Sequence, residues 1–446
     1  MRFPFPKDFL FGAASSAIQI ESACYEDGKG ENIHDRCYKQ EPEEYHGDPN
    51  EAADFYHRYP EDIRMMKELG LKAFRFSISW ARIYPNGPEQ VNEAGLAYYA
   101  DMVDRLLEAD IVPFFDLWHC DLPQWVAERG GLLNPDFIHW FTGYARTVFE
   151  VLGHKVAIWS TVNEPHVNVM GVYMDGVYPP FSKGRKNSYL ASHNMILAHY
   201  RTVRLYKQMG FKGQIGAVVH MPPCYTVEPG TDEDFAATER YHARYFGWWL
   251  DPMLKGCYPE ILMEYPVIRD AMPENFAQQL AAEFIPSDFI GINYYNPASA
   301  KYELDGELDL KVTRDQSLPT DECGFRMYPS GLFDAVMYLK NTYPGKDIYI
   351  TENGYAKKRM ENMEQALEDD YRVNYIREHF RMMSRAIGAG APLKGYFHWS
   401  LMDTHEMRGG FQYLFGLIQV DMKTKARTPR KSWYYYQQII KDGFVT

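Results

Sequence analysis

Tyr349-Ile350-Thr351-Glu352-Asn353-Gly354 is the stretch from which the fold of this chain can be inferred. Three β-prone residues end at a carboxylate, and an Asn-Gly pair, which favours a tight turn, follows at once. The pattern predicts a buried strand that ends at Glu352 and holds its side chain at the C-terminal tip. A loop is expected to open beside this tip.

A second stretch, residues 156–165, has the same form. A mostly apolar run ends in Asn163 and Glu164, and Pro165 stops it because proline cannot donate a hydrogen bond to a neighbouring strand. If the two strands are parallel neighbours in one barrel, Glu164 and Glu352 lie at the same rim. Two carboxylates that face one cavity are the groups needed to cleave a glycosidic bond.

Strand-like and helix-like stretches alternate along the whole chain. Strands are expected at residues 9–20, 73–79, 112–118, 156–162, 214–219, 289–295, 348–351 and 393–400. Helices are expected at residues 59–69, 93–109, 135–152, 189–209, 235–250, 331–341, 370–389 and 431–441, with Gly70 as a C-terminal cap. This order predicts an α/β protein, a single (β/α)8 TIM barrel with one domain over residues 1–446. Residues 222–232 and 298–328 are expected to form long loops at its C-terminal face.

Composition limits the classes of function. The chain has 446 residues, 46% of them apolar, and a formal net charge of -13. Nucleic acids and anionic membranes require a basic surface, so neither is expected as a partner. The six cysteines form no CxxC pair, and the N-terminus lacks an apolar signal core. We therefore expect a cytoplasmic protein with reduced thiols.

Polar and aromatic side chains follow the predicted strands, at the end where a barrel of this kind carries its active site. Groups that bind hydroxyls, together with flat aromatic faces, are the mixture that a sugar requires. The candidate ligands are Gln19, His119, Asn163, Asn293, Tyr295, Trp399 and Glu406. Taken singly, His119 or Trp399 can be an ordinary core residue, and Arg75 can simply neutralise a buried carboxylate.

Other kinds of site fit the same residues less well. His119 and Cys120 are adjacent like a Cys–His pair, but neighbours on a strand point to opposite sides. His119, Asp121 and Glu164 could hold a metal, but no helical HExxH-type spacing supports a metal site. A Schiff-base aldolase needs a lysine that points inward at a strand end, and no lysine occupies the strand ends.

Seven strings in fixed order carry a resemblance. They are residues 9–15 with 19–21, 74–80, His119 with 121–123, Thr161-Val162-Asn163-Glu164-Pro165, residues 291–295, Ile350-Thr351-Glu352-Asn353-Gly354, and residues 399–403. Read together, they resemble glycoside hydrolase family 1, the β-glucosidase family, along nearly the whole chain. The resemblance implies a retaining, exo-acting β-glycosidase without a cofactor, whose substrates are small-molecule β-glycosides or oligosaccharides. Whether the chain forms a homo-oligomer stays open.

The resemblance also implies roles for single residues. Glu164 matches the general acid/base and Glu352 the nucleophile, and retention needs the two carboxyls about 5–5.5 Å apart. We expect Arg75 and Tyr295 to hold Glu352 ionised, and burial and the negative neighbour to raise the pKa of Glu164. Asn163 is expected to hold the sugar 2-hydroxyl. Matches to the family's other sugar ligands are Gln19, His119 and Glu406, which bind hydroxyls, and Trp399, on which the sugar stacks.

The sequence departs from the family at two positions near the terminal sugar. The family usually has Trp where Cys120 and Met407 stand. Either neighbouring aromatic residues fill the space, or the pocket accepts a different or decorated sugar. Two alternative functions are a 6-phospho-β-glycosidase and a sugar-binding barrel that has lost catalysis. The phospho-sugar branch replaces Glu406 by Ser, and the retained carboxylate would repel a phosphate.

Overall fold

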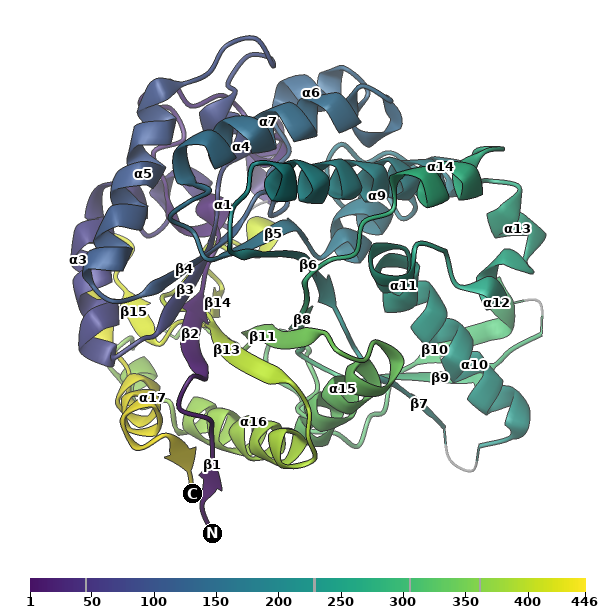
Figure 1. Ribbon diagram of the computed structural model, residues 1–446. Helices are drawn as coiled ribbons and strands as arrows, with labels where there is room; N and C mark the ends of the chain where they lie inside the picture. Colours follow the sequence, from purple (N-terminus) through teal and green to yellow (C-terminus); the bar gives the residue numbers. More distant parts are fainter. Residues whose placement is uncertain (45, 228–229, 305, 361) are drawn as a thin grey trace.

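The computed structural model describes residues 1–44, 46–227, 230–304, 306–360 and 362–446. Eight parallel strands close into a barrel in the order in which they occur in the chain, and β13 pairs with β2 to complete the ring (Figure 1). They are β2 (Leu10–Ala14), β3 (Ala73–Ser77), β4 (Val112–Asp116), β5 (Ile158–Asn163), β6 (Gln214–His220), β8 (Phe289–Asn293), β11 (Asp347–Asn353) and β13 (Leu393–Trp399). The predicted (β/α)8 barrel is confirmed.

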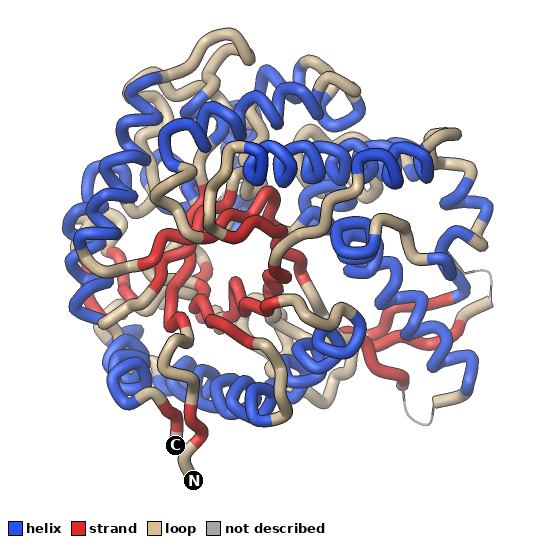
Figure 2. Tube along the Cα trace, in the orientation of Figure 1, coloured by secondary structure: helices blue, strands red, loops and turns tan. Residues whose placement is uncertain are grey.

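Amphipathic helices surround the barrel, as the blue ring around the red strands in Figure 2 shows. The longer ones are α3 (Phe55–Leu69), α5 (Glu93–Glu108), α7 (Phe137–Leu152), α9 (Arg185–Gln208), α15 (Pro329–Thr342), α16 (Asp370–Gly388) and α17 (Lys431–Asp442). The predicted cap of α3 is confirmed, because Gly70 has a φ of 85° and donates to the carbonyls of Met66 and Lys67. In the part of the chain that the structure describes, no helix combines the length and apolarity that a membrane crossing requires.

Shorter elements complete the chain. The short helices are α1 (Ala17–Ile20), α2 (Ile33–Gln40), α4 (Trp80–Ile83), α6 (Gln124–Glu128), α8 (Gly171–Tyr173), α10 (Asp232–His242), α11 (Trp248–Lys255), α12 (Glu260–Met263), α13 (Pro266–Arg269) and α14 (Phe276–Glu283). The short strands are β1 (Phe3–Pro4), β7 (Cys224–Thr226), β9 (Ala298–Tyr302), β10 (Leu310–Thr313), β12 (Lys357–Lys358), β14 (Tyr413–Leu414), β15 (Ile418–Val420), β16 (Arg427–Pro429) and β17 (Phe444–Val445). They make up small two- and three-stranded sheets outside the barrel.

Aromatic side chains fill the interior of the barrel. Phe114 on β4 packs edge-to-face against Phe289 on β8 and Phe397 on β13, with ring centroids 5.6 and 5.3 Å apart. Because β4 is not a neighbour of β8 or β13 in the ring, these contacts cross the barrel axis. The interior is thus a packed core rather than a channel, and a ligand must bind at a rim.

Three predicted elements differ from the structure. The first strand ends at Ala14, and the short helix α1 follows, because the chain turns away from the barrel there. The helix expected at residues 235–250 is divided into α10, a π-helical turn (Ala243–Gly247) and α11. The regions expected to be loops contain β7, β9 and β10, which pair into a separate three-stranded sheet beside the barrel (Figure 1).

Candidate active site

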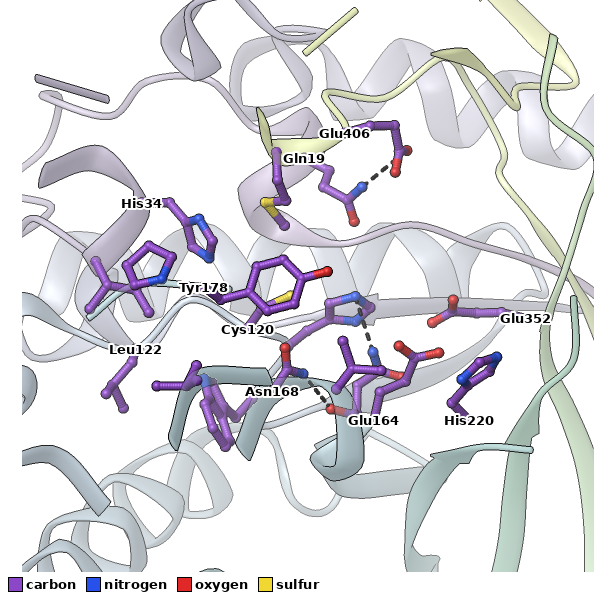
Figure 3. A pocket seen from close by; sticks show the side chains of 18 of the residues that line it. Gln19, His34, Cys120, Leu122, Glu164, Asn168, Tyr178, His220, Glu352 and Glu406 are labelled. Atoms are coloured by element: carbon purple, nitrogen blue, oxygen red, sulfur yellow. Dashed lines mark hydrogen bonds between the residues drawn. The ribbon is translucent and has the colours of Figure 1, made fainter. Parts of the chain in front are cut away.

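Glu164 and Glu352 line one cavity of about 330 Å³ at the C-terminal strand ends. Glu352 is the residue before the last in strand β11, and Glu164 directly follows β5. Figure 3 shows both side chains directed into this cavity. Their strands are not adjacent, because β6 and β8 stand between β5 and β11. The curvature of the closed barrel nevertheless brings both carboxyls to the same rim.

Glu352 is buried against one cation and one phenol. Arg75 Nη1 donates to Glu352 Oε1 at 2.7 Å, and the Tyr295 hydroxyl donates to Oε2 at 2.8 Å. The same guanidinium pairs with Asp116 at 2.7 Å. Burial raises the pKa of Glu352, the Arg75 guanidinium lowers it, and the charge of Glu164 raises it again. The net direction is upward, so ionisation of Glu352 depends on the arginine that touches it.

Glu164 has a different environment. Its Oε1 accepts from the Asn293 amide at 2.8 Å, and burial raises the pKa of its carboxyl; the Asn293 bond and then the His119 and Arg75 charges lower it. The expected contribution of a negative neighbour is found on Glu352 instead. Glu164 has a φ of 44°, a left-handed conformation that is rare outside glycine and is concentrated at functional sites.

Asn293 was predicted to bind substrate, but in the structure it does not line the cavity. It is fully buried and is not among the residues that line the cavity. Its amide donates to Glu164 and, at 3.0 Å, to Asn163 Oδ1, and its oxygen accepts from Thr351 at 2.7 Å. The geometry therefore supports a positioning role for Asn293 in place of the predicted contact with substrate.

The other candidate ligands line the cavity: Gln19, His119, Asn163, Tyr295, Trp399 and Glu406. Gln19 Nε2 donates to Glu406 Oε1 at 3.1 Å, and Asn163 Nδ2 donates to His119 Nε2 at 3.2 Å. The His119 ring lies nearly parallel to Trp399, with centroids 5.8 Å apart. Burial raises the pKa of Glu406 to about 7. Polar groups and one broad aromatic face thus surround a space at the strand ends.

Cys120 and His119 do not lie on a strand, contrary to the sequence interpretation. Both follow the end of β4, and Cys120 has a φ of 61°. Both line the cavity, yet burial raises the pKa of the Cys120 thiol well above its ordinary value, which opposes formation of a nucleophilic thiolate. Within the described residues no group of three or more His, Cys, Asp or Glu is arranged to hold a metal ion.

Several lining residues were not predicted. They include His34, Asn168, Tyr178, His220, Tyr245 and Phe325. His220 is the last residue of β6, directly after the predicted end of that strand, so the rule of strand-end residues could have found it. His34 lies in α2, Asn168 and Tyr245 lie in the π-helical turns His166–Met170 and Ala243–Gly247, and Tyr178 and Phe325 lie in loops; no periodicity marks them. Met407, a position where the sequence departs from the family, also lines the cavity.

Asp403 supports the segment that carries Glu406. The Asp403 carboxylate is fully buried and accepts two bonds of 2.8 Å from the Arg430 guanidinium. Asp403→Ala is expected to lower the free energy of unfolding by about 3–5 kcal/mol, because it leaves a buried guanidinium unpaired. Urea unfolding measures this loss. Asp370→Ala, which removes an exposed partner of Lys431, is the control and should change stability by less than about 1 kcal/mol. Equal losses in the two variants would contradict the prediction.

The fold and the site together define a class of protein. A parallel barrel with two glutamates that line one cavity at its rim has the carboxyl pair that glycoside hydrolases use. The family model of glycosyl hydrolase family 1 matches residues 1–444. The chain belongs to this family and is a glycoside hydrolase.

Known proteins are similar to this chain over nearly their full lengths. Beta-glucosidase A of Acetivibrio thermocellus is 37% identical over 449 residues, and the match covers 99% of each chain. A 6-phospho-beta-galactosidase of Leptotrichia buccalis is 35% identical, with 97% of this chain and 98% of that protein covered. The solved structure of a beta-glucosidase from Thermotoga maritima in complex with deoxynojirimycin has a TM-score of 0.94 at 33% identity, with 99% of each chain covered.

Proposed function

We propose that this family 1 enzyme is a retaining β-glucosidase that removes terminal, non-reducing β-D-glucosyl residues, with Glu352 as nucleophile and Glu164 as acid/base. The observation that carries the proposal is the unequal surroundings of two carboxyls in one cavity. Of the two carboxyls, Arg75 and Tyr295 donate to that of Glu352, whereas the amide of Asn293 donates to that of Glu164. The names of the similar proteins and the sugar-like ligand in the Thermotoga maritima structure support a small glycoside as substrate.

The charge of Arg75 determines which of the two glutamates is protonated. With a guanidinium at 2.7 Å, a negative charge is more stable on Glu352 than on Glu164, so the proton stays on Glu164. In the first step a Glu352 oxygen forms a bond to the anomeric carbon, and the bond to the leaving oxygen breaks. The Glu164 proton passes to that oxygen, and the leaving group departs as an alcohol.

The second step reverses the roles. Glu352 is now an uncharged ester, so the pKa of Glu164 falls and its carboxylate accepts a proton from water. The water oxygen bonds to the anomeric carbon, the ester bond breaks, and Glu352 regains its charge. Two inversions at the same carbon leave the β configuration unchanged.

The other residues that line the cavity bind the hydroxyls and the ring of the sugar. Asn163 faces the position of the 2-hydroxyl, where hydrogen bonds strengthen in the transition state. Gln19 and Glu406, which are bonded to each other, form a polar pair for hydroxyls farther from the reacting carbon. His119 adds a further polar contact, and the sugar ring stacks on Trp399.

Trapping with a 2-deoxy-2-fluoro-β-glucoside that carries a good leaving group tests the proposal. The fluorine slows the second step, so mass spectrometry of the digested enzyme should find one added sugar on the peptide that contains Glu352. Turnover of 4-nitrophenyl β-glucoside in parallel identifies active enzyme. No adduct together with no turnover would favour a sugar-binding barrel without catalysis.

A 6-phospho-β-glycosidase is the second enzymatic candidate, because one relative carries that name. Glu406 argues against it. This carboxyl is in the cavity, bonded to Gln19 and Thr404. With a pKa of about 7 it is partly ionised at neutral pH, so a phosphate placed there would meet negative charge. A cytoplasmic location and one domain over residues 1–446 stay predictions, and self-association stays open.

Cys120 is expected to broaden the range of sugars that the enzyme accepts. Cys120→Trp restores the residue usual in the family and should raise the preference for glucoside over galactoside and fucoside by about tenfold, because an added wall rejects misplaced hydroxyls. The measurement is kcat/KM for aryl β-glucoside, galactoside, fucoside, xyloside and glucuronide side by side. Cys257→Trp, at an exposed cysteine, is the matched control. Unchanged ratios in Cys120→Trp would mean that neighbouring aromatics already fill the space.

A further inference from the structure

A second cavity of about 550 Å³ adjoins the one that holds the two glutamates. The two cavities share three lining residues, His220, Tyr245 and Phe325. Figure 3 shows His220 beside Glu164 and Glu352, so the junction lies next to the carboxyl pair. Apart from His220 on the barrel strand β6, most of the wall of the second cavity comes from outside the barrel, including β9, β10, the π-helical turn Ala243–Gly247 and residues 323–326.

Three arginines line this second cavity: Arg244, Arg314 and Arg326. Arg244 Nη1 is buried and has no hydrogen-bond partner, while its Nη2 contacts the Met174 sulfur at 3.0 Å. Toward the residues that the structure describes, Arg326 donates only its Nε, to the carbonyl of Asp315. Among the described residues no carboxylate forms an ion pair with any of the three guanidinium groups. Unpaired guanidinium groups at a cavity surface are strong binding partners for a carboxylate.

The remaining charges of the cavity do not cancel these cations. Glu307 is the carboxylate among the described lining residues, and it lies 3.5 Å from Arg185, which is outside the lining. Burial lowers the pKa of His220 to about 4, so this imidazole is neutral near pH 7. The cavity is therefore locally positive in a chain whose net charge is -13. Charge of this kind selects anionic ligands.

The junction between the cavities is aromatic. The rings of His166 and Tyr245 stack with centroids 3.8 Å apart, and Tyr295 stacks on Phe325 at 5.0 Å. Such faces suit a flat aromatic group that passes from one cavity to the other. In the proposed reaction the leaving oxygen receives a proton from Glu164, and Tyr245 lines both the cavity that contains Glu164 and the second cavity. The leaving group therefore extends toward the junction.

We propose that the second cavity binds the leaving group of the substrate, and that this group is a phenol bearing a carboxylate, which Arg314 and Arg326 bind. The inference rests on the proposed function, because it names the substrate class of that same site. The phenol ring occupies the aromatic junction, and the carboxylate reaches the guanidinium groups beyond it.

A matched pair of substrates tests the proposal. One is the β-glucoside of 3-(4-hydroxyphenyl)propanoic acid, and the other is the glucoside of the corresponding primary amide. Two methylene groups insulate the phenol oxygen from the charge, so a difference in kcat/KM reports binding rather than leaving-group ability. At low ionic strength the kcat/KM for the acid is expected to exceed that for the amide by about tenfold, because one charge-assisted hydrogen bond contributes a free energy of this size. The ratio should approach one in about 1 M NaCl, where the Debye length is about 3 Å.

Variants locate the effect in the cavity. Arg314→Gln and Arg326→Gln should each lower the acid-to-amide ratio, and the double variant should bring it to about one. The amide serves as the internal reference in every variant. Arg64→Gln, at an exposed arginine on α3 across the barrel, is the control and should leave the ratio unchanged. Arg244 is not substituted, because it is buried and its replacement would change folding as well as binding.

The outcomes separate the two proposals. Equal kcat/KM for acid and amide, or a ratio that survives in the double variant, overturns the carboxylate site while turnover of 4-nitrophenyl β-glucoside still supports the β-glucosidase. If neither the pair nor the 4-nitrophenyl glucoside is cleaved, the proposed function fails and the inference fails with it.

Discussion

Glu352→Gln is expected to lower kcat by a factor on the order of 10⁴ or more, the largest effect of any substitution in this chain. An amide has no negative charge to attack the anomeric carbon, so the first step loses its nucleophile. The amide also leaves Arg75 with only Asp116 as a charged partner. The measurement is kcat with 4-nitrophenyl β-glucoside. The enzyme concentration must be high enough that a residual rate can be distinguished from that of a trace of native enzyme.

Glu68→Gln, at an exposed glutamate on α3, is the control for handling and for charge change and should keep full activity. Thermal unfolding of both variants shows whether the barrel is intact. A Glu352→Gln enzyme that is folded and retains more than about a hundredth of native kcat would remove Glu352 from the role of nucleophile.

Glu164→Ala should produce a large effect that depends on the leaving group. For a glucoside with a poor leaving group, kcat/KM should fall by about 10²–10⁴-fold, because no acid protonates the departing oxygen. For 2,4-dinitrophenyl β-glucoside the first step needs no proton, so the glycosyl-enzyme accumulates. Azide, a nucleophile that requires no general base, should then raise kcat and release β-glucosyl azide.

The pH profile provides a second measurement on the same residue. Glu164 must be protonated to act as an acid, so kcat/KM is expected to fall as pH rises through its raised pKa. In Glu164→Ala this alkaline limb should disappear for the activated substrate. If azide yields no β-glucosyl azide and the alkaline limb persists, Glu164 is not the acid/base.

Much of the fold was predictable from local patterns. Buried parallel strands are short apolar runs, and turn residues such as Asn353 and Gly354 or the proline at position 165 end them. Eight such runs between helical segments leave few topologies other than the barrel. The same rule located Glu164 and Glu352, since a polar residue directly after a buried run has to lie at a strand end.

Two predictions that were wrong, the end of the first strand and the two long loops, have physical causes. Residues 17–20 are apolar enough to extend a strand, but they pack as the short helix α1 against the rim. In the sheet of β7, β9 and β10, β7 pairs with a strand that lies about 75 residues farther along the chain, and all three strands are too short to give a clear alternating pattern. Local pattern cannot report a pairing whose partner is distant in the chain.

The sequence by itself determined which groups reach the rim: two carboxyls, one arginine inside a strand, and polar and aromatic side chains behind them. Only the tertiary structure decided which of these groups touch. Gln19 meets Glu406 across 387 residues, Arg75 reaches Glu352 across 277, and Asn293 turns toward Glu164 instead of the cavity. The order and curvature of the closed barrel set these distances, and the pKa of each carboxyl follows from its contacts, for which the chain carries no local signal.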